Sequence, residues 1–171
     1  MSRAFVRESD FPQLPELPPL ASPLPPGAKN YLTAGGAQRL RDELSRLRDV
    51  ERPRFASAPA DDTDAKRELQ LLDQRIRYLQ ESLRTADITE VKAGPTDVVH
   101  FGATVTVRER NGPETKYRIV GVDETDLDRN WVSWLSPIAR ALMNAKPGEQ
   151  VIFKAPRGEK ELEIVGIENE G

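Results

Sequence analysis

The chain has 171 residues, enough for one ordinary domain or two small ones that bury a core. Its formal net charge of −3 argues against a protein that coats nucleic acid by neutralising phosphates. The lack of cysteine excludes disulfides, and the absence of a long apolar run predicts a cytoplasmic protein with no membrane partner.

The first thirty residues are rich in proline. Proline lacks an amide donor and has a fixed φ, so residues 1–30 predict a disordered tail. Seven of the fourteen prolines lie in it: Pro12, Pro15, Pro18, Pro19, Pro23, Pro25 and Pro26. The alternative is a segment that docks in extended form through its interspersed apolar residues: Phe11, Leu14, Leu17, Leu20 and Leu24.

Residues 31–86 predict an antiparallel coiled-coil hairpin, which we call the finger. Its first helix is expected to begin at Thr33, whose hydroxyl can cap free amides, and Pro53 is expected to kink this helix. The apolar positions of the two helices recur once per turn: Leu40, Leu44 and Leu47, then Leu69, Leu72, Ile76, Leu79 and Leu83. Two such helices joined by a short break bury their stripes against each other.

Arginines are concentrated on the first arm of the finger. Such a charge run is usually a solvated face, and acidic neighbours partly offset it. The alternative is a basic stripe that follows a nucleic-acid backbone inside a partner's channel. The candidates for that contact are Arg46, Arg48 and Arg52.

An acidic cluster lies at the break between the two helices. Asp61, Asp62 and Asp64 suit the first turn of a helix, because carboxylates there cap amides and meet the positive end of the helix dipole. The functional alternative is that Asp61 and Asp64, three residues apart, share a Mg²⁺ ion. Two carboxylates bind this ion weakly, so no metal is expected to be held by this chain alone and a partner must supply the other ligands.

Beyond a linker at residues 87–97, residues 98–171 predict a small antiparallel sheet domain. An alternating run at 103–110, the turn residues Asn111 and Gly112, and a second run at 116–122 are typical of a hairpin. Further strands are expected at 131–135, 151–154 and 161–167. Ser136 and Pro137 are typical of a helix start, so residues 136–143 predict one short helix. The fold class is therefore α+β.

Several runs resemble the bacterial GreA/GreB transcript-cleavage factors. In the second domain these are residues 101–105, 117–124 and 136–142; in the finger they are residues 31–33, 51–53 and 75–79. The resemblance covers about residues 30–169. It implies an FKBP-like second domain that docks at the rim of the secondary channel of RNA polymerase, while the finger enters the channel.

The resemblance also implies roles for individual residues. Acidic residues at the finger tip, here Asp61 and Asp64, help to hold a Mg²⁺ ion and a water in the active centre of the polymerase. The expected docking residues lie around the short helix: Asp123, Ser136, Pro137 and Ile138. The chain would be a monomer with no stably bound cofactor, and RNA or DNA would be contacted only indirectly.

The sequence departs from this family at the tip. The usual glycine and asparagine are missing, and the segment between residues 53 and 75 is about a dozen residues shorter than in GreB-type sequences. Six fewer residues on each arm, at ~1.5 Å per residue, shorten the finger by roughly 9 Å. The hypothesis we favour is thus a channel-binding regulator with weak or no cleavage stimulation.

Two other hypotheses remain. One is an active cleavage factor that uses a different docking pose. The other is an FKBP-like peptide-binding module, for which Trp131 and Trp134 would have to form a pocket. Three apart on a regular strand, the two indoles point to opposite faces, which favours one core and one surface contact.

Overall fold

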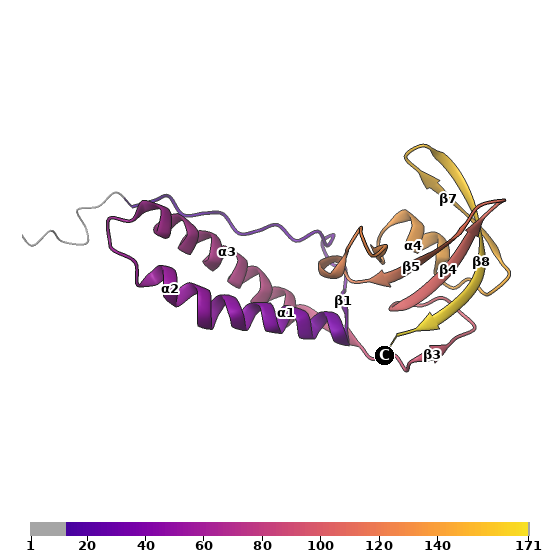
Figure 1. Cartoon of the computed structure of the whole chain (residues 1–171), viewed down its shortest axis with the longest axis horizontal. Helices are drawn as coiled ribbons and strands as arrows, with labels where there is room; N and C mark the ends of the chain where they lie inside the picture. Colours follow the sequence, from indigo (N-terminus) through magenta and orange to yellow (C-terminus); the bar gives the residue numbers. More distant parts are fainter. Residues whose placement is uncertain (1–12, 171) are drawn as a thin grey trace, which may run out of the picture. The chain divides into compact units, whose positions relative to one another are not determined.

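The computed structural model describes residues 13–170, so Phe11 and Pro12 lie outside the described residues. The chain divides into two compact units, each visible in Figure 1. One contains Arg39–Arg84 with the described residues up to Ser22, and the other contains Pro23–Gln38 and Thr85–Gly171. Mixed helices and sheets confirm the α+β class.

The first helical arm runs from Ala34 to Ala56 in three consecutive segments: α1 (Ala34–Arg46), η2 (Leu47–Glu51) and α2 (Arg52–Ala56). The π-helical segment η2 lies directly before Pro53. A proline inside an α-helix lacks its amide hydrogen and clashes with the carbonyl four residues earlier, and a wider turn relieves that clash. Pro53 therefore does not end the arm.

The second arm is α3 (Thr63–Thr85), and it pairs with the first arm as a helical hairpin. The buried apolar side chains of this unit come from both arms: Leu40, Leu47, Ala65, Ile76 and Leu79. Arg52 Nε lies 2.6 Å from Asp73 Oδ1, and Arg75 Nε lies 2.8 Å from Glu43 Oε1, so two ion pairs also join the arms. The predicted helical hairpin is confirmed. Four of its expected apolar residues, Leu40, Leu47, Ile76 and Leu79, are buried, whereas Leu44, Leu69, Leu72 and Leu83 are half-buried, and the buried Ala65 was not expected.

A segment assigned above to a disordered tail is extended and contacts α3. Gln70 donates to the carbonyl oxygens of Leu14 and Pro15, and Gln74 donates to that of Pro18. The expectation of a free tail is therefore wrong for these residues, because side-chain donors on α3 meet carbonyls that a proline-rich backbone leaves unused.

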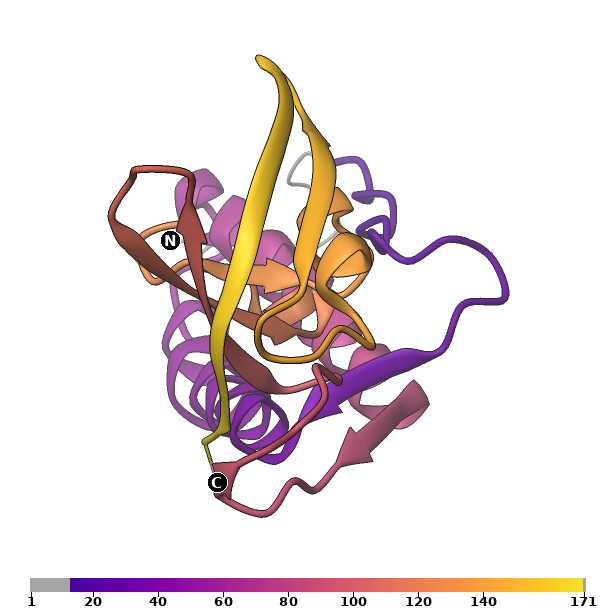
Figure 2. The same ribbon diagram turned by 90° about the vertical axis from the view of Figure 1, so that its right-hand side faces the viewer.

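The second unit contains a six-stranded sheet with the order β3-β8-β4-β5-β6, in which β7 also pairs with β8. Its strands are β3 (Gly94–Pro95), β4 (Ala103–Glu109), β5 (Glu114–Val120), β6 (Trp131–Ser133), β7 (Gln150–Ala155) and β8 (Gly158–Asn169). Asn111, with φ 59°, turns the β4–β5 hairpin as predicted. Figure 2 shows β7 and β8 extending together as a long hairpin.

The sheet is not antiparallel throughout. β5 and β6 are parallel, with Ile119 opposite Val132, which corrects the expectation of a purely antiparallel sheet. The reason is the long connection at residues 121–130, which includes η3 (Val122–Glu124) and returns the chain in the same direction.

Three strands were not expected from the sequence: β3, which lies in the predicted linker, and two that form a separate sheet. β1 (Asn30–Thr33) and β2 (Ala86–Thr89) form a two-stranded parallel sheet with Leu32 opposite Ile88. Asn30 lies at the end of the predicted tail, residues 31–33 and 86 lie in the predicted finger, and residues 87–89 lie in the predicted linker. The two strands are more than fifty residues apart in the chain, so a local sequence pattern does not predict their pairing.

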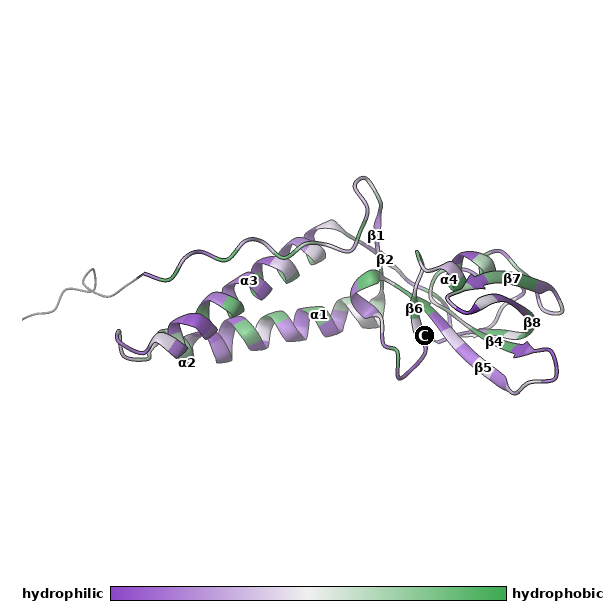
Figure 3. Ribbon diagram, turned by 90° about the horizontal axis from the view of Figure 1, so that it is seen from above, coloured by the Kyte–Doolittle hydropathy of each residue, from purple (hydrophilic) through white to green (hydrophobic). Residues whose placement is uncertain are grey.

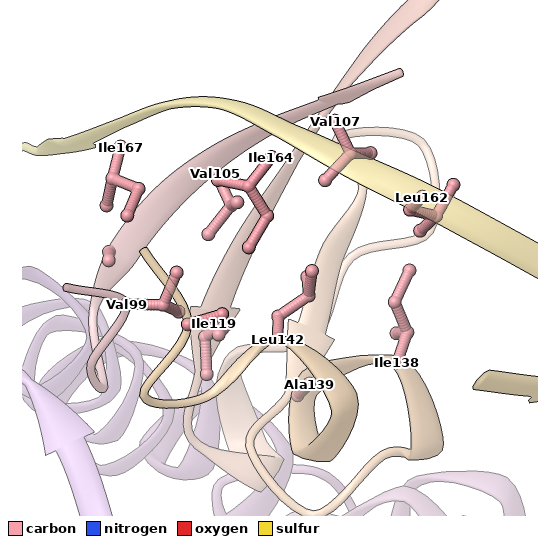
Figure 4. Close-up of a cluster of buried hydrophobic side chains, with 12 residues drawn as sticks. Val99, Val105, Val107, Ile119, Ile138, Ala139, Leu142, Leu162, Ile164 and Ile167 are labelled. Atoms are coloured by element: carbon pink, nitrogen blue, oxygen red, sulfur yellow. The ribbon is translucent and has the colours of Figure 1, made fainter. Parts of the chain in front are cut away.

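The core of the sheet domain lies between the sheet and α4 (Pro137–Leu142). Figure 4 shows Ile138, Ala139 and Leu142 of α4 facing Val105 and Ile164 of the sheet. Leu142 and Ile164 are both 0% exposed. This packing makes the second unit the better-filled part of the molecule.

Candidate functional site

The loop between α2 and α3 presents the acidic cluster to solvent. Asp61, Asp62 and Asp64 are all exposed. Asp62 caps α3, because its Oδ1 accepts a hydrogen bond of 2.9 Å from the backbone amide of Ala65. The capping hydrogen bond thus belongs to Asp62, whereas none is described for Asp61 in the loop or for Asp64 in the first turn of α3.

The acidic side chains at the tip of the finger are candidate metal ligands. Within residues 13–170 no group of three or more histidine, cysteine, aspartate or glutamate side chains is arranged to hold a metal ion. Asp61 and Asp64 could contribute carboxylate oxygens to a Mg²⁺ ion whose other ligands come from elsewhere.

The three candidate channel-facing arginines are all engaged by carboxylates of this chain. Arg46 lies 2.6 Å from Glu51, Arg48 lies 2.8 Å from Asp49, and Arg52 pairs with Asp73. The hydrogen bond from Arg48 lowers the pKa of the Asp49 carboxyl, and the bond to Asp73 raises the pKa of the Arg52 guanidinium. Their charge is therefore largely neutralised locally, which favours a solvated face over a stripe for phosphates.

The expected docking residues of the sheet domain divide into two kinds. Ser136 caps α4, accepting a 3.3 Å hydrogen bond from the amide of Ala139, and Pro137 is the exposed first residue of the helix. Ile138 is only 9% exposed and belongs to the core, so its expected place at an exposed edge is wrong. The first turn of α4 rotates this side chain toward the sheet. Pro137 is exposed, and Ser136 and Asp123 are half-buried.

The neighbour of Asp123 has a role that the sequence analysis missed. Glu124 is buried, and its carboxylate accepts hydrogen bonds from the backbone amides of Thr33 (3.0 Å) and Gly121 (2.9 Å) and from the Thr33 hydroxyl. A Cβ built on Gly36 would lie 1.8 Å from Glu124 Oε1. A side chain at position 36 would therefore displace the buried carboxylate, and no local sequence pattern links Gly36 to Glu124.

Glu124 also organises the start of α1. The hydroxyl of Thr33 accepts a 3.0 Å hydrogen bond from the amide of Gly36, as expected of a helix cap. The same hydroxyl donates to Glu124, so one carboxylate holds both the end of β1 and the cap of α1. The carboxylate is thus a structural anchor with all its partners inside this chain.

The two tryptophans do not form a ligand pocket. The guanidinium groups of Arg118 and Arg129 lie 4.9 and 5.1 Å from the Trp131 ring centroid. The Trp134 ring packs edge-on against Tyr31 at 5.0 Å and contacts the core. Both indoles thus contact side chains of this chain while staying half-buried, and no described contact favours a peptide-binding pocket at these residues.

A family model and several relatives match this chain. The model described as "Transcription elongation factor, GreA/GreB, C-term" matches residues 94–169. The transcription elongation factor GreB of Neisseria meningitidis serogroup A is 38% identical over 153 residues, covering 82% of this chain and 94% of that protein. The transcription elongation factor GreA of Alkalilimnicola ehrlichii is 40% identical over 154 residues, covering 82% of this chain and 98% of that protein.

A solved structure, the GreA factor homolog 1 protein of Thermus thermophilus, is 26% identical, with a TM-score of 0.39 and coverage of 84% of this chain and 100% of that one. No described helix is long and apolar enough to cross a membrane.

Proposed function

Because this chain belongs to the GreA/GreB family of transcription elongation factors, we propose that it binds bacterial RNA polymerase at the rim of the secondary channel and modulates transcription. The observation that carries this proposal is the similarity to a GreB and a GreA over 82% of the chain, more than the sheet domain alone could supply. The chain is not itself an enzyme. At most it changes how the polymerase cleaves its own transcript.

The tip of the finger would act through Asp61 and Asp64. Both side chains are exposed, and neither caps α3. A carboxylate that reached the active centre could help to hold a second Mg²⁺ and lower the pKa of a water bound to it. The factor would supply ligands, and the polymerase would supply the remaining coordination sphere.

The length of the finger argues for weak or no stimulation of cleavage. The 153 aligned positions of the GreB relative correspond to 82% of the 171 residues here, that is about 140 residues, so about a dozen positions have no counterpart in this chain. The number agrees with the dozen residues inferred from the sequence to be missing between residues 53 and 75. With α3 at 23 residues, or about 35 Å, a loss of roughly 9 Å is a quarter of its length.

Metal–oxygen bonds are about 2 Å long, so side-chain rotamers cannot make up a deficit of that size. We therefore propose that the finger occupies the channel without delivering its carboxylates to the catalytic metal. Occupation alone would alter nucleotide entry or initiation.

The test uses the full chain, core RNA polymerase and transcription complexes stalled on backtracked RNA. We expect the protein to be retained by the polymerase in a pull-down while releasing few or no short 3′ RNA fragments. Absence of binding would overturn the proposal as a whole.

Prompt release of 3′ fragments would instead establish the active-factor alternative. In that case the double variant Asp61→Asn/Asp64→Asn should lose the activity. Glu68→Gln, which removes an exposed charge from the same helix, is the matched control and should retain it.

A further inference from the structure

We propose that the outer face of α3 is a recognition site for an extended proline-rich segment, and that residues 13–20 of this chain, here called the strap, occupy it as a third element of the finger. Figures 1 and 3 both show this segment running beside α3. The inference does not depend on the proposed function.

Two glutamines provide the polar half of the site. Gln70 and Gln74 are four residues apart on α3 and therefore project from the same face. The side-chain amide of Gln70 donates to the carbonyls of Leu14 (3.4 Å) and Pro15 (3.0 Å), and that of Gln74 donates to the carbonyl of Pro18 (2.6 Å). The contacts run in the same order along both segments, so the strap lies parallel to α3.

These contacts suit a proline-rich backbone in particular. An extended polyproline-type segment forms no internal hydrogen bonds, so its carbonyls are free to accept. Each glutamine amide carries two N–H donors and can serve neighbouring carbonyls. Recognition through backbone acceptors does not need side-chain functional groups, which prolines lack.

Three leucines provide the apolar half. A polyproline-type helix has three residues per turn, so Leu14, Leu17 and Leu20 lie along one edge. Leu14 and Leu17 are half-buried, whereas the neighbouring Pro15, Pro18 and Pro19 are exposed. From this difference in exposure we infer that Leu14 and Leu17 face the finger. Leu20 is 41% exposed, so the contact weakens at that end of the strap.

The strap can stabilise the finger by covering part of the outer face of α3. Each helix of a two-helix hairpin buries only the stripe that faces its partner, and its outer face stays in water. Leu71, next to Gln70 on α3, is 44% exposed even with the strap in place. A polyproline-type segment is already extended before it binds, so ordering it costs little conformational entropy.

The experiment exploits the absence of cysteine, since one introduced cysteine takes a label at a single site. Glu16, an exposed strap residue, is replaced in the full chain (Glu16→Cys) and labelled with a nitroxide. Paramagnetic broadening of backbone amide NMR signals then reports which residues lie near the strap. We expect broadening centred on residues 68–76 of α3. Weak broadening spread evenly over the chain would overturn the proposal.

The glutamine contacts are tested by Gln70→Ala/Gln74→Ala in the labelled chain. Alanine favours helix, so α3 should stay folded. Loss of these hydrogen bonds, each of modest net strength, should lower the docking equilibrium constant by about tenfold and reduce the broadening accordingly. Gln80→Ala, an exposed glutamine of the same helix, should leave it unchanged. Equal broadening in the double variant and the control would overturn the role of the pair.

The leucine edge is tested with a synthetic peptide of residues 13–22 added to the labelled chain. Because a tethered strap acts at an effective concentration of about millimolar, the peptide is supplied above that level. It should displace the strap and reduce the broadening, whereas the same peptide with Leu14→Ser and Leu17→Ser should not. If both peptides act alike, the leucine edge is not what α3 recognises and the proposal fails.

Discussion

The sheet domain and the finger are stabilised in different ways. In the sheet domain, side chains from β4, β8 and α4 fill a continuous core, and Val105, Leu142 and Ile164 are fully buried. In the finger, a single apolar seam is supplemented by ion pairs between partly exposed side chains. Burial resists small changes in solvent, whereas exposed ion pairs are weak and are screened by salt. The stability of the finger should therefore depend more on ionic strength than that of the sheet domain.

The largest expected effect lies in the core of the sheet domain. Ile164→Ala removes a fully buried side chain from β8 and leaves a cavity, so the free energy of unfolding should fall by about 3–4 kcal/mol in urea titrations. Val165→Ala is the control, because its side chain on the opposite face is 38% exposed, and it should cost under about 1 kcal/mol. Similar losses for both variants would contradict the core described here.

The second largest loss of stability is expected when the buried carboxylate of Glu124 is removed. Glu124→Ala leaves the amides of Thr33 and Gly121 without their acceptor, which should cost about 2–3 kcal/mol of stability. The amide proton signals of Thr33 and Gly121 should also shift in NMR spectra. Asp123→Ala, at the half-buried neighbour, should cost under about 1 kcal/mol and leave those two signals in place.

A smaller effect is expected at the tip of the finger. Asp62→Ala removes the cap of α3, so stability measured by thermal unfolding should fall by about 1 kcal/mol. Asp61→Ala removes the same charge from an exposed neighbour that does not cap the helix, and its stability should match the unaltered chain. If both variants lose the same stability, the charge near the helix dipole, and not the capping hydrogen bond, stabilises the first turn of α3.

The smallest effect should come from the ion pairs between the arms. A double-mutant cycle with Glu43→Gln and Arg75→Gln should give a coupling energy of about 0.5–1 kcal/mol, because both side chains are partly exposed. The coupling should shrink as salt is raised from low to molar concentration. If the coupling energy does not change with salt, this ion pair behaves like a buried contact. The finger and the sheet domain would then not differ in how they are stabilised.

The sequence predicts much of the local structure because local signals lie within one helical turn or one hairpin. Thr33 and Ser136 cap helices where expected, and Asn111 turns the β4–β5 hairpin. The leucine spacing predicts the helical hairpin, and the runs of residues that resemble GreA and GreB predict the family. The candidate roles of Asp61 and Asp64 stay predictions until cleavage is measured.

What the sequence alone determined about this protein is therefore its helices, its hairpin turn, its caps and its family. Only the tertiary structure decided that β1 pairs with β2, that Glu124 is buried while Asp123 is not, and that the strap lies along α3. These contacts join residues far apart in the chain, Thr33 and Glu124 being separated by 91 positions. A residue's own neighbours set its backbone preference, but its burial and its partners depend on which distant segments the fold brings to it.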